Sequence, residues 1–368
     1  MTDDAPISIE TPWRRDAEEL AERLAEWAVE RFGAGTVIGN VSSPEGTGMS
    51  SETVLFEVTN TDGSRQGCVV RLAPQAEVFP VFEHYDLELQ GRCMQLVGEH
   101  TSVPVPDVIH YEADTSWLGT PFLVMGRVDG VTPPDVPPYV FGGWVADLTE
   151  AERAALMDHS VRVLAELHRL TPETHDLSFL ANADDGSDVI DQLLAGQRHY
   201  YDWSRGELRS KLIEATFEWL DTNRPATGER VLNWGDSRIG NMLYRGVEPV
   251  AVLDWEMAGQ GPREVDLAWM IFLHRFFQRM AEQYGMPGLP TFMERSDLVA
   301  RYESYSGHTV TSLEWFEVYA ALRFAIVSIR TSLRGVHYGQ QEPVDDPDEL
   351  IMFRPLLEEM LAGTYWSG

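Results

Sequence analysis

Lysine is almost absent from this chain of 368 residues: Lys211 is the single lysine among 28 basic residues. A phosphate-binding loop of the Walker type needs the run Gly-x-x-x-x-Gly-Lys, which does not occur here. Chemistry through a lysine Schiff base is disfavoured for the same reason. Any mechanism that requires a lysine must therefore use Lys211.

Cysteine is equally scarce, since Cys68 and Cys93 are the two in the chain. Two cysteines cannot build a disulfide framework or a four-cysteine zinc site, and this usage is typical of a reducing cytoplasm. The first four residues are acidic where a secretory signal would be basic, and no apolar run approaches the roughly 18 residues of a membrane span. We expect a soluble, cytoplasmic protein.

Basic residues are few relative to acidic ones. The 28 Lys and Arg stand against 59 Asp and Glu, which gives a formal net charge of −31 at pH 7. Nucleic-acid backbones and anionic membranes repel such a protein, so neither is expected as a partner, whereas cationic small molecules are not excluded. A hydrophobic share of 43% allows a sizeable core, and the length suggests two domains or one domain of two lobes.

The first third of the chain mixes helical and strand-like patterns. Apolar residues at helical spacing predict helices over 13–32 and 84–98. Short apolar runs between turn-forming residues predict antiparallel strands over 37–42, 52–59, 68–72, 108–112 and 121–127.

A proline-rich connector over 133–138 separates this part from a mainly helical remainder. Thr149 and Glu152 form a capping-box sequence, in which each side chain can bond the other residue's free backbone amide at a helix start. Strand signals return in one hairpin, over 242–244 and 250–253. The predicted helices cover 150–170, 188–203, 207–222, 263–284, 296–306 and 312–334.

The segment around Asp236 carries the chemistry. Arg238 follows two positions after Asp236, Asn241 follows after five, and Asp254 stands just beyond the predicted hairpin. Kinases use this spacing to assemble phosphoryl transfer. Asp236 can accept a hydrogen bond from a substrate hydroxyl and later its proton. Asn241 and Asp254 offer the hard oxygen ligands that suit Mg²⁺, and Arg238 can neutralise phosphoryl charge.

With this motif the chain resembles the aminoglycoside phosphotransferase-like (APH/choline kinase) family of small-molecule kinases, whose fold is similar to that of protein kinases. The family's catalytic loop usually reads His-Gly-Asp-x-x-x-x-Asn and is followed by a metal aspartate. The matching residues here are Trp234, Gly235, Asp236, Asn241 and Asp254. Asp266-Leu-Ala matches a helix start of the family, and the short link to it favours a small-molecule kinase over a phosphorylation-switched protein kinase.

The resemblance implies an α+β, bilobal protein-kinase-like fold. Residues 1–126 would form a small nucleotide-binding N-lobe of antiparallel sheet and helix, and residues 127–368 a larger, mainly helical lobe for catalysis and substrate binding. Its cofactors would be ATP and Mg²⁺. Asp236 and Arg238 would be catalytic, and Asn241 and Asp254 would bind the metal.

Two departures from the family pattern affect the site. Trp234 replaces the usual histidine, and an indole has one donor and no acceptor, so the support of the loop must be rearranged. Arg71 stands on the third strand where kinases place a lysine against the phosphates, a role that a guanidinium can fill. Its candidate partner on the next helix is Glu88, with Glu83 or Glu99 as alternatives.

Further residues are assigned to the nucleotide by the same resemblance. Ser50 and Ser51, at the end of a glycine-bearing loop, would cover the phosphates, and backbone groups near Met125 and Arg127 would bond the adenine. Glu88 would pair Arg71. Asp266 and His168 are not assigned to the nucleotide: Asp266 would cap its helix or steady the catalytic loop, and His168 is expected to be a buried core or helix-end residue rather than a catalyst.

The acceptor is left open by these motifs. Expected activities are an ATP-dependent O-phosphotransferase acting on a hydroxyl of an aminoglycoside-like small molecule, or a kinase of hydroxyacyl-CoA or of another metabolite alcohol. A non-catalytic nucleotide-binding pseudokinase is the alternative from a different class, prompted by Trp234 and the missing lysine. The oligomeric state is not readable from these residues.

Overall fold

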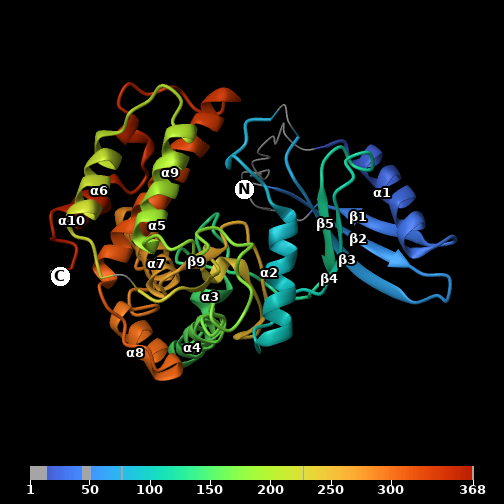
Figure 1. Ribbon diagram of the computed structural model, residues 1–368, viewed down its shortest axis with the longest axis horizontal. Helices are drawn as coiled ribbons and strands as arrows, with labels where there is room; N and C mark the ends of the chain where they lie inside the picture. Colours follow the sequence, from blue (N-terminus) through green and yellow to red (C-terminus); the bar gives the residue numbers. More distant parts are fainter. Residues whose placement is uncertain (1–14, 44–50, 76–77, 227, 367–368) are drawn as a thin grey trace, which may run out of the picture.

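The N-terminal part of the chain is a five-stranded antiparallel sheet with strand order β1-β2-β3-β5-β4. The structure is a computed structural model that describes residues 15–43, 51–75, 78–226 and 228–366. Figure 1 shows this sheet and α1 on one side, and most of the other helices on the opposite side. The elements are α1 (Ala17–Phe32), β1 (Val37–Ser42), β2 (Glu52–Thr59), β3 (Arg65–Leu72), α2 (Leu87–His100), β4 (Val108–Glu112) and β5 (Phe122–Gly126).

Each face of the sheet packs against a different core. Val54, Phe56 and Val58 alternate along β2 and share a buried cluster with α1, because successive side chains of a strand point to opposite faces. Leu123 and Met125 of β5 belong instead to the larger cluster, which includes α2 and the C-terminal helices. The sheet is therefore held between α1 and the rest of the molecule.

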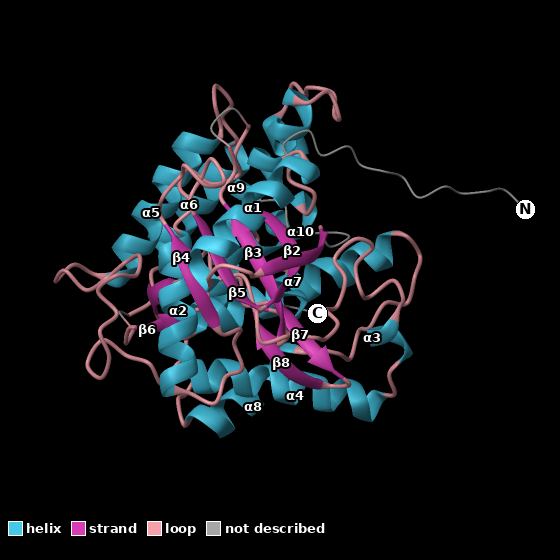
Figure 2. Cartoon of the chain, turned by 90° about the vertical axis from the view of Figure 1, so that its right-hand side faces the viewer, coloured by secondary structure: helices cyan, strands magenta, loops and turns pink. Residues whose placement is uncertain are grey.

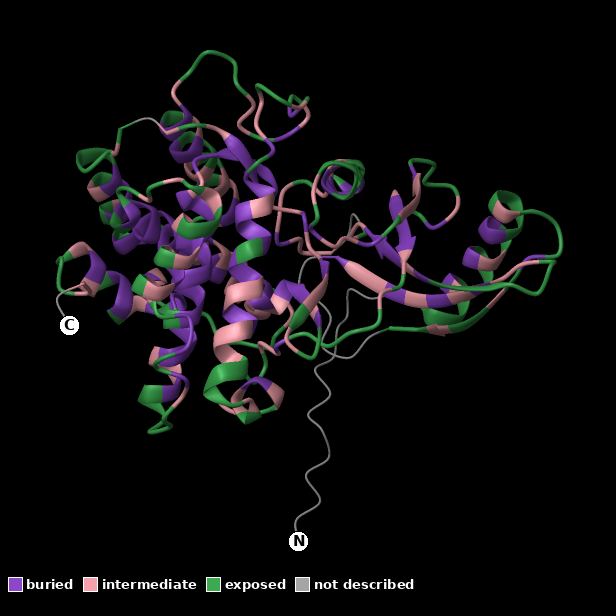
Figure 3. Cartoon of the chain, turned by 90° about the horizontal axis from the view of Figure 1, so that it is seen from below, coloured by how far each residue is buried: buried purple, intermediate pink, exposed green. Residues whose placement is uncertain are grey.

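The C-terminal part is mainly helical, with α7 (Glu264–Gln283) and α9 (Leu313–His337) packed against each other. Figure 3 shows that buried residues dominate the centre of this part. The predicted capping box is present, because Thr149 and Glu152 bond each other's backbone amides. The remaining helices are α3 (Trp144–Asp147), α4 (Glu150–Leu167), α5 (Val189–Ser204), α6 (Lys211–Thr222), α8 (Arg295–Ser306) and α10 (Arg354–Leu361).

Two small sheets accompany these helices, where the sequence predicted a single hairpin. The predicted hairpin is β7 (Met242–Arg245) with β8 (Glu248–Val252), which lies beside α4 (Figure 2). The second sheet pairs β6 (Val231–Asn233) with β9 (Gly259–Gly261) and was not predicted. Three-residue strands are too short to display an alternating pattern.

Helix starts differ from prediction where a capping residue sets them. The helix expected from 84 begins at Leu87, since Asp86 accepts a hydrogen bond from Leu89 N. The helix expected from 207 begins at Lys211, since Ser210 caps it. In the described part of the chain, none of the helices is both long and apolar enough to cross a membrane.

The chain passes from the sheet to the helical part directly after β5. Val131 and Tyr244 exchange backbone hydrogen bonds of 2.9 and 2.8 Å, so the chain has already reached β7 at this point. The α+β, kinase-like fold is as expected. The division into residues 1–126 and 127–368 stays a prediction.

Candidate functional site

Asp236 lies at the centre of a hydrogen-bonded cluster, on the loop between β6 and β7. Its Oδ1 accepts a hydrogen bond from the Trp269 indole, and its Oδ2 accepts one from the Asn241 amide, both at 2.7 Å. Arg238 Nε lies 3.1 and 3.2 Å from the two oxygens. These four contacts from three donors engage the roughly four lone-pair directions of the carboxylate, so a substrate hydroxyl would replace one of them. The structure thus brings Asp236, Arg238 and Asn241 together.

Gly235 allows this loop to press against the segment that follows Asp254. Its φ is +91°, and a Cβ atom at this position would lie 2.0 Å from the carbonyl oxygen of Met257. No side chain can be accommodated at that distance. The close approach of two backbones explains why the residue before the aspartate is glycine.

Asp266 forms hydrogen bonds to the backbone of this loop on its buried side. Its two carboxylate oxygens accept hydrogen bonds from the backbone amides of Trp234 and Gly235, at 2.8 and 2.9 Å. His168 Nε2 lies 3.0 Å from the same carboxylate, and His168 Nδ1 lies 2.8 Å from the Tyr302 hydroxyl. All of these groups are buried. Asp266 therefore steadies the catalytic loop, and His168 is a buried structural residue, as expected.

Trp234 provides the rearranged support that its replacement of histidine requires. Its indole N–H donates to the backbone carbonyls of Leu253 and Asp254, at 2.8 and 3.2 Å. The side chain is completely buried. The tryptophan thus fastens the catalytic loop to the segment that carries Asp254.

The β7–β8 hairpin brings Asn241 and Asp254 near each other. Leu253 N donates to Asn241 O at 2.9 Å, directly beyond the paired strands. Asp254 has a φ of +60°, a left-handed conformation that is uncommon for residues other than glycine. Among the described residues no group of three or more His, Cys, Asp or Glu could hold a metal. One carboxylate and one carboxamide nevertheless fit Mg²⁺, which takes few protein ligands alongside phosphates and water.

Arg71 reaches across from β3 to this segment. Its guanidinium lies 3.1 Å from Asp254 Oδ1 and 3.8 Å from Glu256 Oε2, and it donates two hydrogen bonds to Ser51 Oγ. Burial alone would lower the pKa of Arg71, but the two carboxylates outweigh it and raise the pKa above its usual value. The charged guanidinium of Arg71, which comes from the sheet, therefore contacts Asp254, the predicted metal ligand.

The expected pairing of Arg71 with Glu88 is wrong. Glu88 is exposed in the first turn of α2, and within the described residues the ion pairs of Arg71 are those with Asp254 and Glu256. Glu83 does not replace it, because it lies 2.6 Å from His199 Nε2. The physical reason is that Asp254 and Glu256, which are part-buried, offer a closer and less hydrated partner than a carboxylate on an exposed helix turn.

Other predicted nucleotide residues fall at separate places. Ser50 lies outside the described residues, whereas Ser51 bonds Arg71. Met125 is buried in β5 between β3 and β4. The Arg127 amide already donates to Gly67 O at 2.9 Å, and its side chain is exposed. Adenine binding near these two residues stays a prediction.

Two residues of the cluster were not singled out from the sequence. Asp135, in the proline-rich connector, forms an ion pair with Arg238. Burial lowers the pKa of Arg238, but Asp236 and Asp135 outweigh this and raise it. Arg323 stacks on Trp269, 4.4 Å from its ring, and donates to Gly235 O at 3.0 Å. The one sequence signal for these residues was that Arg323 interrupts the apolar run of α9.

The fold and this cluster define a small-molecule-kinase type of protein. The model of the phosphotransferase enzyme family matches residues 46–294. The chain belongs to the phosphotransferase enzyme family.

Solved structures of the same fold include bacterial antibiotic phosphotransferases. A Ralstonia eutropha JMP134 protein described as an aminoglycoside phosphotransferase superposes with a TM-score of 0.66 at 20% identity, over 94% of this chain and 98% of that one. Macrolide 2′-phosphotransferase MphH from Brachybacterium faecium gives 0.56 at 17% identity, over 90% and 97%. These likenesses show the fold.

Curated relatives are longer proteins. The probable acyl-CoA dehydrogenase IBR3 of Arabidopsis thaliana is 26% identical over 86% of this chain, which spans 39% of the length of IBR3. Human acyl-CoA dehydrogenase family member 11 is 29% identical over 55% of this chain and 25% of its own length. The chain thus spans well under half the length of these relatives.

Proposed function

We propose that this protein is an ATP-dependent, Mg²⁺-requiring O-phosphotransferase that acts on a hydroxyl of a small molecule. One observation carries the proposal: Asp236, Arg238 and Asn241 form one hydrogen-bonded cluster, and Asp254 lies beside it in contact with Arg71. The family to which the chain belongs, and neighbours of this fold solved with AMP-PNP or ADP, support the use of a nucleotide.

Asp236 is proposed to bind and deprotonate the acceptor. The hydroxyl oxygen forms a bond to the γ-phosphorus as the bond to the β,γ-bridging oxygen breaks, so ADP leaves and the hydroxyl proton passes to the Asp236 carboxylate. Trp269 and Asn241 orient this carboxylate through their hydrogen bonds. Arg238 counters charge on the phosphoryl group.

Asn241 and Asp254 are proposed to hold Mg²⁺, with the nucleotide phosphates supplying further ligands. The ion would neutralise phosphate charge when it is bound. Arg71 donates hydrogen bonds to both Asp254 and Ser51, and its guanidinium can bind phosphate oxygens instead, because it fits them in a fork geometry. The proposed cytoplasmic location rests on composition alone.

The acceptor class is to be found by experiment. A panel of aminoglycosides, macrolides, hydroxyacyl-CoA compounds and other metabolite alcohols is tested for ADP release with mass-spectrometric detection of the phosphorylated product. Asp236→Asn is expected to lower kcat by about 10³-fold, since general-base catalysis contributes 10²- to 10⁴-fold. Asp202→Asn, which changes a half-exposed aspartate of α5, is the matched control and keeps full activity.

If Asp236→Asn transfers phosphate at the normal rate, Asp236 does not deprotonate the acceptor. The pseudokinase alternative predicts a different result: ATP raises the unfolding temperature, yet no compound yields a phosphorylated product. A single phosphorylated product excludes that alternative.

A further inference from the structure

Arg323 of α9 is a buried arginine beside the catalytic loop, and it contacts both segments of the chain that form the candidate site. Its Nη2 donates a hydrogen bond to the carbonyl oxygen of Gly235, the residue before Asp236, at 3.0 Å. The same nitrogen lies 3.9 Å from Sδ of Met257, in the segment that follows Asp254. One side chain thus touches the catalytic loop and the segment that carries the predicted metal ligand.

A further contact connects Arg323 to the Asp236 carboxylate through Trp269. The guanidinium carbon of Arg323 lies 4.4 Å from the centre of the Trp269 ring, and the indole N–H of this ring donates to Asp236 Oδ1 at 2.7 Å. A cation over the face of an indole is attracted by its π electrons and draws electron density towards itself. The N–H of that ring becomes a stronger donor, because polar contacts in a low dielectric polarise one another.

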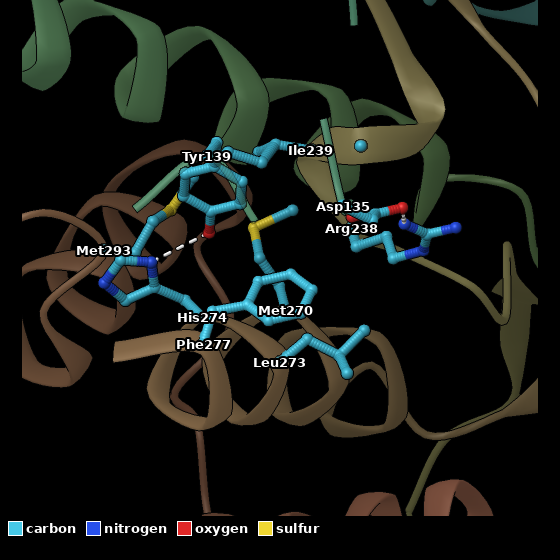
Figure 4. A pocket seen from close by; sticks show the side chains of 10 residues that line it. Asp135, Tyr139, Arg238, Ile239, Met270, Leu273, His274, Phe277 and Met293 are labelled. Carbon is cyan, nitrogen blue, oxygen red and sulfur yellow. Dashed lines mark hydrogen bonds and ion pairs between the residues drawn. The ribbon is translucent and has the colours of Figure 1, made fainter. Parts of the chain in front are cut away.

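Arg323 has no carboxylate partner among the described residues, which distinguishes it from Arg238. Figure 4 shows Arg238 beside Asp135, with which it forms an ion pair, and Arg238 also contacts Asp236. In the same described ranges, the contacts of Arg323 are a backbone carbonyl, a thioether and two aromatic rings. Its Nη1 is buried and donates no hydrogen bond to any of these residues.

Such an arginine lowers the free energy of unfolding. A buried cation loses its hydration and, without a carboxylate, gains no ion pair in return. A buried N–H that lacks an acceptor adds a further cost. Methionine fills a similar space with neither cost, so core packing does not explain an arginine at position 323.

We propose that Arg323 is a positioning residue for phosphate transfer: through Trp269 it strengthens the hydrogen bond that orients the Asp236 carboxylate, and through Gly235 it holds the adjoining backbone. The inference rests on the proposed function and adds a residue that acts from outside the reacting groups. Its benefit falls on kcat rather than on binding, because the oriented carboxylate is the group that takes up the proton during the reaction.

The first test removes the charge. Arg323→Met should lower kcat about tenfold with the acceptor that the panel identifies, while the KM values for ATP and for the acceptor change by less than about twofold. The midpoint of urea denaturation should stay the same or rise, because a buried unpaired charge has been removed. A purely structural role would lower stability and rate together. An unchanged kcat of the folded enzyme would overturn the inference.

Arg198→Met is the matched control. Arg198 of α5 is part-buried and lies over the ring of Phe217 of α6, 3.7 Å from its centre. The same loss of a cation from an aromatic ring should leave kcat unchanged there. If Arg323→Met does not fold, Arg323→Gln decides alone: it removes the charge but keeps a side-chain N–H donor, and it should lower kcat by a similar factor. A wild-type kcat in Arg323→Gln would overturn the inference.

A double-mutant cycle tests the route through Trp269. Trp269→Phe removes the indole N–H, so the charge of Arg323 should then have little left to act on. In the Trp269→Phe background Arg323→Met should lower kcat by no more than about threefold, which is the part that acts through Gly235, against about tenfold in the wild type. Equal factors in the two backgrounds would overturn the inference.

A hydrogen-exchange measurement separates this inference from the function on which it rests. By NMR, the indole N–H of Trp269 should exchange with deuterium at least about tenfold faster in Arg323→Met than in the wild type. The indole N–H of Trp315, which also donates to a buried carbonyl, should keep its rate. Faster exchange at Trp269 without a phosphorylated product from any acceptor would support the positioning contact and refute the kinase proposal. An unchanged exchange rate would overturn the inference, whether or not the enzyme turns over.

Discussion

The two sides of the catalytic loop are built from different interactions. Asp266 and His168 lie on one side of the loop, here called the lower side, and their side chains are 0% and 1% exposed. Asp266 accepts hydrogen bonds from backbone amides of the loop and contacts His168. On the other, upper side, the side chains of Asp236, Arg238 and Asp135 are 13%, 24% and 36% exposed and form carboxylate–guanidinium pairs. The lower side is dry and fixed, and the upper side is charged and open to water.

This difference separates stability from activity. Groups below the loop have no route to a ligand, so their bonds serve to hold the backbone in place. Pairs above the loop can exchange a partner for a phosphate or a hydroxyl, because water already reaches them. Substitutions below the loop should therefore cost folding free energy, and substitutions above it should mainly cost rate.

Asp266→Ala is expected to have the largest effect on stability. It leaves the buried amides of Trp234 and Gly235 without an acceptor, at a cost of about 1–3 kcal/mol each. The free energy of unfolding, from urea denaturation, should fall by about 3 kcal/mol or more, and phosphate transfer should fall with it because the loop is no longer held.

Asp348→Ala is the matched control for this change. Asp348 is also buried and bonds Ser210 and the Leu212 amide at the start of α6. Its loss should lower stability by a similar amount but leave the KM for ATP and the rate of the folded enzyme unchanged. If Asp266→Ala keeps the wild-type rate, the lower side of the loop does not position Asp236.

The sequence was sufficient to predict the kinase-like fold and the convergence of Asp236, Arg238 and Asn241, whose catalytic roles stay predictions. Helical spacing, turn residues and capping signals are local, so they place elements to within a few residues. The spacing of Asp236, Arg238 and Asn241 spans six positions, and the hairpin to Asp254 is also local. These groups indeed converge.

Pairings between distant elements could not be predicted in this way. Arg71 finds Asp254 rather than Glu88 because of how the sheet lies against the hairpin, which no local pattern encodes. Trp269 belongs to an apolar stripe of α7, and such a stripe does not reveal which indole meets a carboxylate. Strands β6 and β9 have three residues each and form by pairing with each other, so neither shows a strand pattern of its own.

Trp269→Phe tests the upper side of the loop. Phenylalanine keeps most of the ring but removes the N–H that donates to Asp236, so kcat should fall about tenfold, which corresponds to about 1.4 kcal/mol. Stability should change by no more than about 1 kcal/mol.

Trp315→Phe provides the comparison for this variant. The Trp315 indole donates to Leu220 O at 2.9 Å in a buried position on α9, away from the catalytic loop. The same deletion of a donor there should leave kcat unchanged. An unchanged kcat in Trp269→Phe as well would mean that the tryptophan merely packs beside Asp236.

His274 gives an effect that arises only at acid pH, and it tests whether this buried ring stays uncharged. Burial lowers the pKa of His274 to about 4, from 6.5 when the ring is exposed. Above pH 6.5 neither the folded nor the unfolded state binds this proton. As the pH falls from 6.5 towards 4, the unfolded chain binds it and the folded protein does not, so the free energy of unfolding should fall by about 1.4 kcal/mol per pH unit.

Urea denaturation of His274→Asn between pH 6.5 and 4 should therefore show a smaller slope of stability against pH than the wild type, by about that amount. Equal slopes for wild type and His274→Asn would mean that the folded protein also takes up the proton. The ring bonded to Tyr139 would then become charged at acid pH in spite of its burial.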